Sequence, residues 1–319
     1  MSTALISLIF IAAGILLLVK GADWFVKGSS ALAKRINMSE LAIGLTVVAF
    51  GTSAPELIVN VFAAAENHPE IVLANVLGSN NINLFIILGA AGVIAPLQVQ
   101  SSTAWKEIPF SIFVIFILLI FTNDWFISSE ITKISRIEGA LLLVLFILFL
   151  LYVYKQLAHD PHSQKYEGNT FSLLKTWSLI IVGLAALIAG GKIIVSNAVD
   201  LARHLQISEK IIGITIIALG TSLPELATSV VAAFKRNTDI AVGNIIGSNI
   251  FNLLLVIPVS ALIRPINFSK DFNTDIYILA GGTLFLFLAM YTGKIKRLDR
   301  WEASILLVFY VGYMISLVA

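Results

Sequence analysis

The chain has 319 residues, 58% of them hydrophobic, and a mean hydropathy of +0.94. Charged residues make up 13% of it, whereas a soluble domain uses about 25% to cover its surface. This excludes an ordinary soluble protein and indicates a chain that crosses a membrane several times. The net charge of +2 offers no basic surface to nucleic acid. The absence of cysteine excludes disulfides, cysteine-ligated zinc and a thiol nucleophile.

The apolar runs predict ten membrane-spanning helices, each of which needs about 20 apolar residues. The first run extends towards Trp24. It follows no positive charge and precedes no small-residue cleavage site, so we expect a retained helix and not a signal peptide. The predicted spans cover residues 4–19, 41–65, 71–96, 108–121, 140–154, 177–195, 211–234, 240–262, 276–290 and 303–318.

Lysine and arginine are unevenly distributed between the loops. Loops after odd-numbered spans hold thirteen of them, and loops after even-numbered spans hold six. The positive-inside rule therefore puts the first set in the cytoplasm and both termini on the extracytoplasmic side of the cell (inner) membrane. The most polar stretch, residues 155–176, is too short for a regulatory domain. We expect a connector at 158–172 between two halves, residues 1–157 and 173–319.

The two halves contain the same sequence at a constant offset of 169 residues. SELAIGLTVVAFGTSAPE at 39–56 matches SEKIIGITIIALGTSLPE at 208–225 at eleven of eighteen positions, and NVLGSN at 75–80 matches NIIGSN at 244–249. The repeated regions thus cover about 39–84 and 208–253. Because each half holds five spans, an odd number, the second copy enters the membrane from the opposite side. We therefore expect an all-α polytopic membrane protein with ten transmembrane helices in two inverted-topology five-helix repeats, as in many secondary transporters.

Each repeat carries one carboxylate in the middle of a predicted span, Glu56 in the first and Glu225 in the second. A carboxylate at this depth costs about 2.5–3.5 kcal/mol on insertion scales. No cationic side chain lies at an obviously matching depth, so a metal cation from outside is the simplest partner. The alternative is a pair of protonated carboxyl groups bonded to the backbone.

The residues before each Glu interrupt a helix. Pro55 donates no N–H and crowds the carbonyl of Gly51, and Pro224 repeats the arrangement. Main-chain carbonyls near Ala49 and Ala218 should thereby become available as ligands. Irregular backbone at this depth survives only around a cavity or inside the protein. A simple proline kink repaired by Ser and Thr is the alternative, and it explains one copy better than two.

The adjoining spans supply further oxygen atoms. Ser79 and Asn83 are four residues apart, hence on one helix face, and the same holds for Ser248 and Asn252. An all-oxygen set suits Ca²⁺, Mg²⁺, Mn²⁺ or Na⁺ and not Zn²⁺ or Cu²⁺. Two carboxylates balance one divalent or two monovalent ions, and protons can compete for the empty site. The remaining asparagines of the motif favour helix packing and backbone bonding over ion ligation: Asn75, Asn80, Asn244 and Asn249.

These motifs resemble the Ca²⁺/cation antiporter superfamily over nearly the whole chain, and within it the prokaryotic Na⁺/Ca²⁺ exchangers. The resemblance implies antiport of Na⁺ against Ca²⁺ by alternating access, with spans one and six sliding as a unit past the ion-binding core. It also implies one central metal site and no other cofactor. The implied ligands are Glu56, Glu225, Thr52, Ser53, Thr221, Ser222, Ser79, Asn83, Ser248 and Asn252, with the carbonyls of Ala49 and Ala218.

The chain departs from these relatives at two positions. Some have Asp where this chain has Asn252, and K⁺-dependent exchangers use that Asp for K⁺, so the resemblance disfavours K⁺ co-transport here. Lys192 pairs with Asp23 by the repeat offset and stands where relatives often have an acidic residue. Its charge would oppose cation entry if it faced the ion path, and we expect it to extend to the membrane interface instead.

Several rival functions remain to be compared. An H⁺/Ca²⁺ antiporter is the closest, although the T-S-x-P-E form favours Na⁺, and Mg²⁺ or Mn²⁺ could replace Ca²⁺. An intramembrane enzyme is disfavoured because no H-E-x-x-H or G-x-G-D motif occurs and all four histidines fall in loops or at span ends. No Walker A sequence indicates ATP, and inverted repeats favour a transporter over a channel. The expected partners are the two ions and the lipid bilayer, and the sequence leaves the oligomeric state open but compatible with a monomer.

Overall fold

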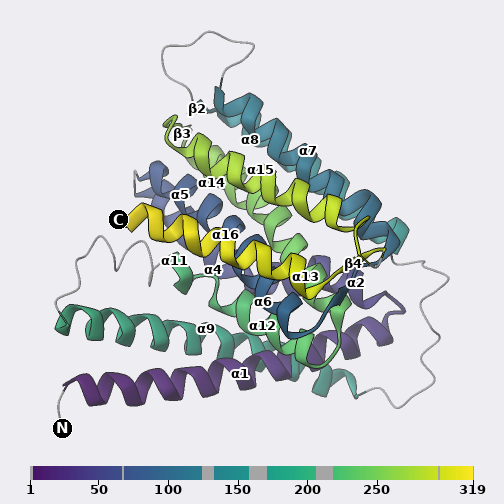
Figure 1. Cartoon of the computed structure of the whole chain (residues 1–319), viewed down its shortest axis with the longest axis vertical. Helices are drawn as coiled ribbons and strands as arrows, with labels where there is room; N and C mark the ends of the chain where they lie inside the picture. The colour runs from purple at the N-terminus through teal and green to yellow at the C-terminus, as the bar shows by residue number, and fades with distance from the viewer. Residues whose placement is uncertain are drawn as a thin grey trace.

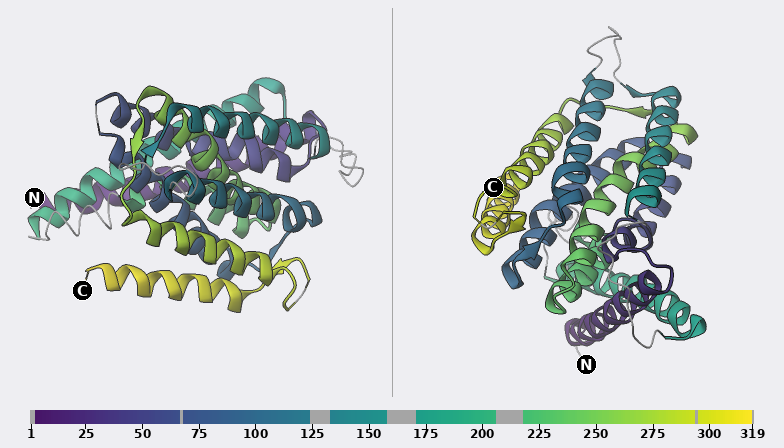
Figure 2. Two further views of the ribbon diagram at one scale, coloured as in Figure 1. Left: turned by 90° about the horizontal axis from the view of Figure 1, so that it is seen from above. Right: turned by 90° about the vertical axis from the view of Figure 1, so that its right-hand side faces the viewer.

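The computed structural model describes residues 3–66, 68–123, 133–157, 171–205, 218–293 and 295–318. Helices dominate these residues, and two long helices lie side by side along one edge of a bundle formed by the others (Figures 1 and 2). Both ends of the chain lie at the same end of the bundle (Figure 1).

The first half of the chain runs from α1 to the π-helical segment η4. Its elements are α1 (Thr3–Arg35), α2 (Glu40–Ile43), η1 (Gly44–Val48), α3 (Ala49–Thr52), α4 (Ala54–Ala65), α5 (Pro69–Asn81), η2 (Ile82–Ile87), α6 (Leu88–Ile94), β1 (Leu97–Gln98), η3 (Thr103–Glu107), α7 (Ile108–Asn123), β2 (Lys133–Ile134), α8 (Arg136–Tyr152) and η4 (Val153–Leu157).

The second half repeats this order. Its described elements are α9 (Leu173–His204), α11 (Ala218–Gly220), α12 (Leu223–Phe234), α13 (Thr238–Phe251), η6 (Asn252–Val256), α14 (Ile257–Ile263), β3 (Ile266–Asn267), α15 (Phe272–Ala289), β4 (Arg297–Leu298) and α16 (Arg300–Val318). Several boundaries differ by 169 from those of the first half, among them those of α4 and α12 and of α6 and α14.

The predicted spans coincide with these helices wherever the chain is described. Residues 211–217 of the seventh predicted span, and residues 158–170 of the connector predicted at 158–172, lie outside the described residues. Within the described ranges, seven helices are long and apolar enough to cross a membrane, or eight if the bent pair Glu40–Thr52 and Ala54–Ala65 counts as one span. Helices α1 and α9, which contain the first and sixth predicted spans, run well past their apolar stretches. At 1.5 Å per residue each is about 50 Å long, so each must be tilted or project beyond a hydrocarbon core about 30 Å thick.

Helices α1 and α9 pack against each other, antiparallel, through glycines spaced seven residues apart. A Cβ built on Gly21 would lie 2.8 Å from the Leu187 backbone N, and one on Gly183 would lie 2.6 Å from the Phe25 N. Gly14 and Gly190 approach each other in the same way, and Gly21 and Gly190 are equivalent by the repeat offset. The absence of side chains at these positions lets the two backbones touch, as in other membrane helix pairs.

A larger residue in this contact should destabilise the protein. For Gly183→Val we expect a loss of about 1–3 kcal/mol in the free energy of unfolding, the usual cost of overpacking. Thermal unfolding of the purified protein in detergent measures the loss. Gly281→Val is the matched control, because a Cβ at Gly281 meets no atom of the described chain within 4 Å. Equal effects of the two substitutions would contradict the packing argument.

Strands and helices of one half of the chain pair with strands and helices of the other half. Strand β1 pairs with β4 and strand β2 pairs with β3, each antiparallel and each joining one half to the other. Helix α8 packs on α14, and α16 packs on α6. Arg136 donates to the carbonyls of Leu262 and Ile263 at the end of α14, at 3.0 and 3.2 Å, and Arg300 donates to Ile94 at the end of α6, at 3.3 Å. Each half therefore depends on the other for part of its tertiary contacts.

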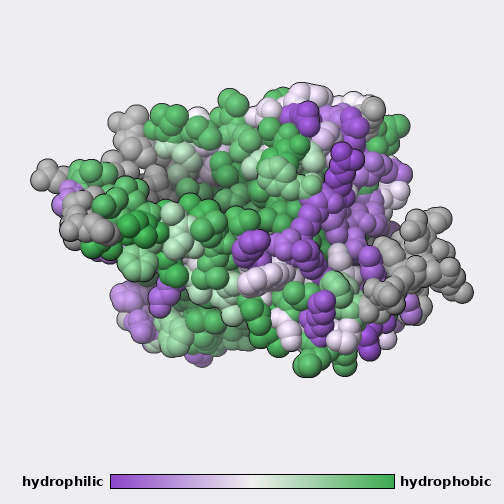
Figure 3. All heavy atoms as spheres, turned by 90° about the horizontal axis from the view of Figure 1, so that it is seen from below, coloured by the Kyte–Doolittle hydropathy of each residue, from purple (hydrophilic) through white to green (hydrophobic). Residues whose placement is uncertain are grey.

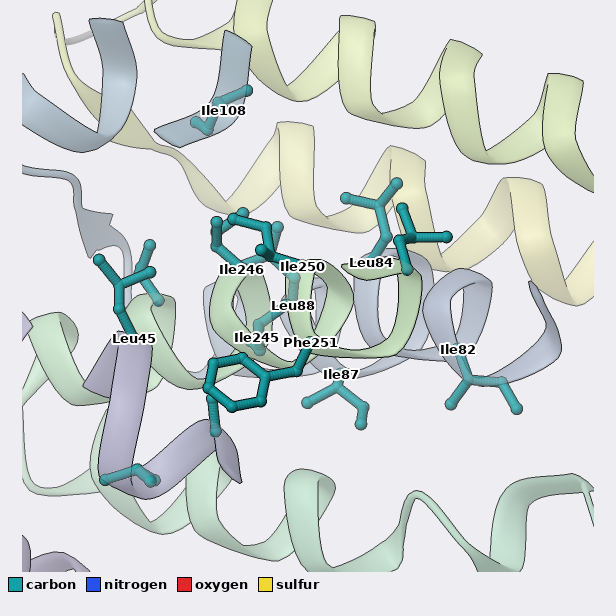
Figure 4. Packing of buried hydrophobic residues seen from close by; sticks show 14 of the residues in the cluster. Leu45, Ile82, Leu84, Ile87, Leu88, Ile108, Ile245, Ile246, Ile250 and Phe251 are labelled. Carbon is teal, nitrogen blue, oxygen red and sulfur yellow. The ribbon is translucent and has the colours of Figure 1, made fainter. Parts of the chain in front are cut away.

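Apolar side chains cover both the interior and much of the outside of the bundle. The interior packs around α13, whose residues are all buried from Ile240 to Phe251, against η2 and η1 (Figure 4). The face seen in Figure 3 is largely hydrophobic, with hydrophilic side chains gathered in a band towards one end. Large apolar side chains such as Leu16, Ile147 and Val308 are exposed, as a lipid-facing surface requires.

Candidate functional site

The two helix breaks predicted from the sequence have the same geometry. Ser53 stands between α3 and α4 with φ −84° and ψ 2°, and Ser222 stands between α11 and α12 with φ −87° and ψ 5°. At the first break the helix bends by 46°. Pro55 and Pro224 occupy the first turns of α4 and α12, where their missing N–H groups leave no hydrogen bond unmade.

The glycines of the motif bring the breaks close to the α1–α9 pair. A Cβ at Gly51 would lie 2.9 Å from the ring of Phe25 in α1, and one at Gly220 would lie 2.4 Å from Val195 in α9. Their role is therefore close packing, in addition to the loosening of the turn that the sequence indicates. A movement of α1 or α9 along the bundle would therefore change the contacts of Gly51 and Gly220 at the two breaks.

Each carboxylate lies in the first turn of the helix that follows a break. Glu56 is the third residue of α4 and Glu225 the third residue of α12, and each is 1% exposed. Ser53 of the first half donates to Oε1 of Glu225 at 3.0 Å. The two breaks therefore meet, and the carboxylates of both halves share one buried region. A helix N-terminus also favours the negative charge of each carboxylate.

The threonines of the motif reach across to the opposite half. Thr52 Oγ1 lies 3.0 Å from Asn244 Oδ1, to which it donates, and 3.5 Å from Ser248 Oγ. Thr221 Oγ1 donates to Asn75 Oδ1 at 3.5 Å, which is the same contact with the halves exchanged. Asn244 in turn donates to the carbonyl of Glu225.

Four asparagines form reciprocal hydrogen bonds between α5–η2 and α13–η6. Asn80 Nδ2 donates to the carbonyl of Asn249 at 3.2 Å, and Asn249 Nδ2 donates to the carbonyl of Asn80 at 3.3 Å. The Oδ1 atoms of these two residues accept from the amides of Asn252 and Asn83, at 3.0 and 3.1 Å. The expectation that Asn75, Asn80, Asn244 and Asn249 bond to neighbours agrees with these contacts. We call Asn80, Asn83, Asn249 and Asn252 the asparagine quartet.

Several oxygen atoms of the predicted site are buried without a hydrogen-bond partner. Buried acceptors normally have a partner, because an unpaired one costs about 1–3 kcal/mol. Unpartnered buried oxygens also occur elsewhere in the described chain, for example Glu107 Oε2, but here they accompany two carboxylates, and such a set can coordinate a cation. The unpartnered atoms of the predicted site are Glu56 Oε2, Glu225 Oε2, Ser79 Oγ, Ser222 Oγ, Asn83 Oδ1 and Asn252 Oδ1.

The two main-chain carbonyls predicted as ligands, those of Ala49 and Ala218, have less support from the structure. The carbonyl of Ala49 accepts the N–H of Ser53 at 3.0 Å and lies 3.4 Å from the Thr52 hydroxyl, so the break has not freed it completely. Ala218 is the first described residue of α11. A Cβ at Gly247 would lie 2.7 Å from that of Ala49, whereas a Cβ at Gly78 would meet no described atom within 4 Å.

Some features of the site were not predicted from the sequence. Asn60 donates to the carbonyl of Glu56 at 2.7 Å, one turn further along α4, and its position four residues after the glutamate was the available signal. The π-helical segments η2 and η6 begin at Ile82 and Asn252, so both quartet members expected as ligands lie in widened turns, which are frequent at functional sites. Lys192 lines a cavity together with Thr221 and Pro224, beside the second break.

The donor set decides what the site can hold. Within the described part of the chain, no group of three or more His, Asp or Glu side chains is placed to bind a metal ion. Binding must therefore combine two carboxylates with neutral hydroxyl and amide oxygens. Hard cations such as Ca²⁺ and Na⁺ accept such ligands, and the low number of charges suits an ion that is released again.

The family model for sodium/calcium exchanger proteins matches residues 6–155 and 175–319, one match in each half. The chain is 39% identical to CaxA of Alkalimonas amylolytica over 97% of this chain and 98% of that protein. It is 30% identical to the sodium/calcium exchanger MaX1 of Methanosarcina acetivorans, over 98% of both.

A solved structure of the sodium-calcium exchanger NCX_Mj has the same fold. It superposes with a TM-score of 0.84 at 30% sequence identity, over 98% of this chain and 99% of that one. The resemblance inferred from the motifs is thereby confirmed over the full length of the chain. The chain belongs to the sodium/calcium exchanger protein family, and it is a multi-pass membrane protein.

Proposed function

We propose that this protein is a secondary antiporter that exchanges Na⁺ for Ca²⁺ at one central site by alternating access. The observation that carries the proposal is the pair of buried glutamates, one from each half, among oxygen atoms that have no partner in the protein. Two carboxylates that face each other repel unless a cation or a proton lies between them. A site of charge −2 is neutralised by one Ca²⁺ or by two Na⁺, so the two cargoes compete for the same atoms.

The proposed ligands come equally from both halves. Glu56, Glu225 and the amide oxygens of Asn83 and Asn252 form the centre of the site. Hydroxyl groups complete it, together with main-chain carbonyls of the two breaks. These further ligands are Thr52, Ser53, Ser79, Thr221, Ser222, Ser248, Ala49 and Ala218. The relative NCX_Mj is described as a sodium-calcium exchanger, and its extracellular ion exchange was studied in structures soaked with Na⁺ and Ca²⁺ or Sr²⁺, which supports the choice of cargo.

The proposed architecture is ten transmembrane helices in two inverted repeats, residues 1–157 and 173–319, joined by a connector at 158–172. The exchanged strand and helix pairs, and the matching boundaries of α4 and α12, support the repeat. Both chain ends lie at one end of the bundle (Figure 1), as an even number of spans requires. The excess of Lys and Arg in the other set of loops supports extracytoplasmic termini.

Reconstitution into liposomes tests the proposal. Proteoliposomes loaded with Na⁺ and diluted into Na⁺-free medium containing ⁴⁵Ca²⁺ should accumulate the isotope, and dissipating the Na⁺ gradient with an ionophore should stop the accumulation. Empty liposomes are the control. If uptake is instead driven by a higher proton concentration inside the liposomes and is indifferent to Na⁺, then H⁺ and not Na⁺ is the counter-ion. Uptake of Mn²⁺ or Mg²⁺ in preference to Ca²⁺ would change the divalent cargo.

A further inference from the structure

An ion pair joins α1 to the core at one end of the α1–α9 pair. The ammonium group of Lys235, the residue after α12, lies 2.5 Å from Asp23 Oδ1 and also donates to the Asp23 carbonyl at 3.2 Å. Lys27 contacts the other carboxylate oxygen at 2.8 Å. Nearby, Ser30 of α1 donates to Glu40 at 2.6 Å and accepts from Asn237 at 3.0 Å. Polar contacts thus hold α1 against the core at this end.

The repeat offset maps this ion pair onto a second pair with the charges exchanged. Asp23 corresponds to Lys192 in α9, and Lys235 corresponds to Glu66, the residue after α4. The two helix ends are alike: α4 and α12 each have 12 residues, Glu66 has φ −82° and ψ 9°, and Lys235 has φ −81° and ψ 2°. Lys192 and Glu66 are therefore placed to form the counterpart of the Asp23–Lys235 pair at the other end of the molecule.

In the structure Asp23 and Lys235 form an ion pair, whereas Lys192 and Glu66 do not. Lys192 and Glu66 are both described, both are exposed, and no ion pair joins them. A cavity of about 300 Å³ lies between α9 and α4, lined by Lys192, Pro55, Val59, Thr221 and Pro224 among others. At the corresponding place in the other half, α1 packs along α12. The α1–α9 pair is thus pressed onto the core at one end and separated from it at the other, next to the second helix break.

We propose that Asp23–Lys235 and Lys192–Glu66 are two alternating latches that hold the α1–α9 pair in its two positions on the core. This rests on the proposed alternating-access function. Sliding that closes the cavity brings Lys192 towards Glu66 and draws Asp23 away from Lys235. Asp23 and Lys235 are 26% and 31% exposed, so water can replace their contact when the latch opens. Each latch is weak enough to break, and the loss of one is offset by formation of the other.

Disulfide trapping tests the proposal cleanly, since the natural chain has no cysteine. We expect Asp23→Cys/Lys235→Cys to form a disulfide on mild oxidation. Lys192→Cys/Glu66→Cys should also form one, more slowly when conditions favour the present conformation. Each disulfide should stop exchange, and reduction should restore it. The control Lys192→Cys/Lys235→Cys joins opposite ends and should form none within one chain. Absence of the Lys192→Cys/Glu66→Cys disulfide in protein that exchanges normally would overturn the proposal.

A second measurement needs no disulfide and no transport. Ser196→Cys places a thiol in the lining of the cavity, where a maleimide can report how open it is. Asp23→Lys should break the first latch and slow labelling by up to about fivefold, the population change that an exposed ion pair supports. Asp23→Lys/Lys235→Asp should restore the wild-type rate. Equal labelling in all three proteins would overturn the latch, whereas failure of Na⁺-driven uptake in unmodified protein would instead count against the proposed function.

Discussion

Glu225→Gln is expected to abolish Na⁺-driven Ca²⁺ uptake, and so is Glu56→Gln. Glutamine keeps the size of the side chain and the hydrogen bond from Ser53 to position 225, but it removes one of only two charges in the site. The site then carries −1, which leaves a bound Ca²⁺ with an uncompensated positive charge in a region 1% exposed. Burying an unbalanced charge costs several kcal/mol, and each 1.4 kcal/mol lowers the affinity tenfold.

The same substitutions should change stability in a way that loss of folding would not. In the wild type, Ca²⁺ at a hundred times its Kd should raise the free energy of unfolding by about 2.7 kcal/mol. Thermal unfolding of purified protein with and without Ca²⁺ measures this. In Glu225→Gln the ion-free protein should unfold at a higher temperature than the ion-free wild type, because the repulsion between the carboxylates is gone. Addition of Ca²⁺ should then have little effect.

Glu107→Gln is the matched control. Glu107 is also buried, directly precedes a predicted span and accepts a hydrogen bond from Tyr152, but it is the last residue of η3 and belongs to neither break. Its replacement should leave uptake and the Ca²⁺-dependent stabilisation near wild-type levels. Normal exchange in Glu56→Gln or Glu225→Gln would contradict the proposed site, and equal loss in Glu107→Gln would show that any buried carboxylate is required.

Helix positions followed from the sequence because apolar runs of this length permit little else in a bilayer. The extension of α1 to Arg35 and of α9 to His204 did not follow from hydropathy, because both ends lie beyond the apolar runs of the sequence. The exchange of strands and helices between halves was equally invisible, because pairings such as Leu97 with Leu298 join residues far apart in the chain.

The sequence predicted which residues belong to the site, but it did not predict the hydrogen bonds between them. A mid-span Glu after a proline, repeated at one offset, was sufficient to identify Glu56 and Glu225 as candidates. The sequence analysis separated Asn83 and Asn252 from the asparagines expected to pack or bond to the backbone, but it could not show which atom of each amide is bonded and which is not. The structure separates them by hydrogen bonding: Asn80 and Asn249 have both amide atoms occupied, whereas Asn83 and Asn252 keep Oδ1 unpartnered.

The orientation of the quartet is fixed by main-chain carbonyls, which can only accept. Asn249 must turn its NH₂ group to the Asn80 carbonyl, so its Oδ1 faces Asn83. Asn83 must therefore present its NH₂ group to Asn249, which leaves its own Oδ1 without a partner, as a ligand of the proposed site requires. The same arrangement occurs with the two halves exchanged. Asn80 turns its NH₂ group to the Asn249 carbonyl, and its Oδ1 accepts from the NH₂ group of Asn252. The supporting asparagine thus determines which atom of its neighbour faces the site.

Asn249→Ala should consequently weaken Ca²⁺ binding by about 10- to 100-fold, the usual cost of losing a residue that orients a metal ligand. Without the Asn249 acceptor, the amide of Asn83 can turn its NH₂ group towards the cation. The Ca²⁺ concentration at half-maximal uptake, or the Ca²⁺ dependence of thermal unfolding, measures the change. Asn80→Ala should act equally through Asn252, because the two halves contribute alike. Asn81→Ala is the matched control, since Asn81 is buried beside the quartet but donates to the Asp275 carbonyl. A normal Ca²⁺ dependence in Asn249→Ala, or an equal loss in Asn81→Ala, would show that the quartet packs the helices without orienting a ligand.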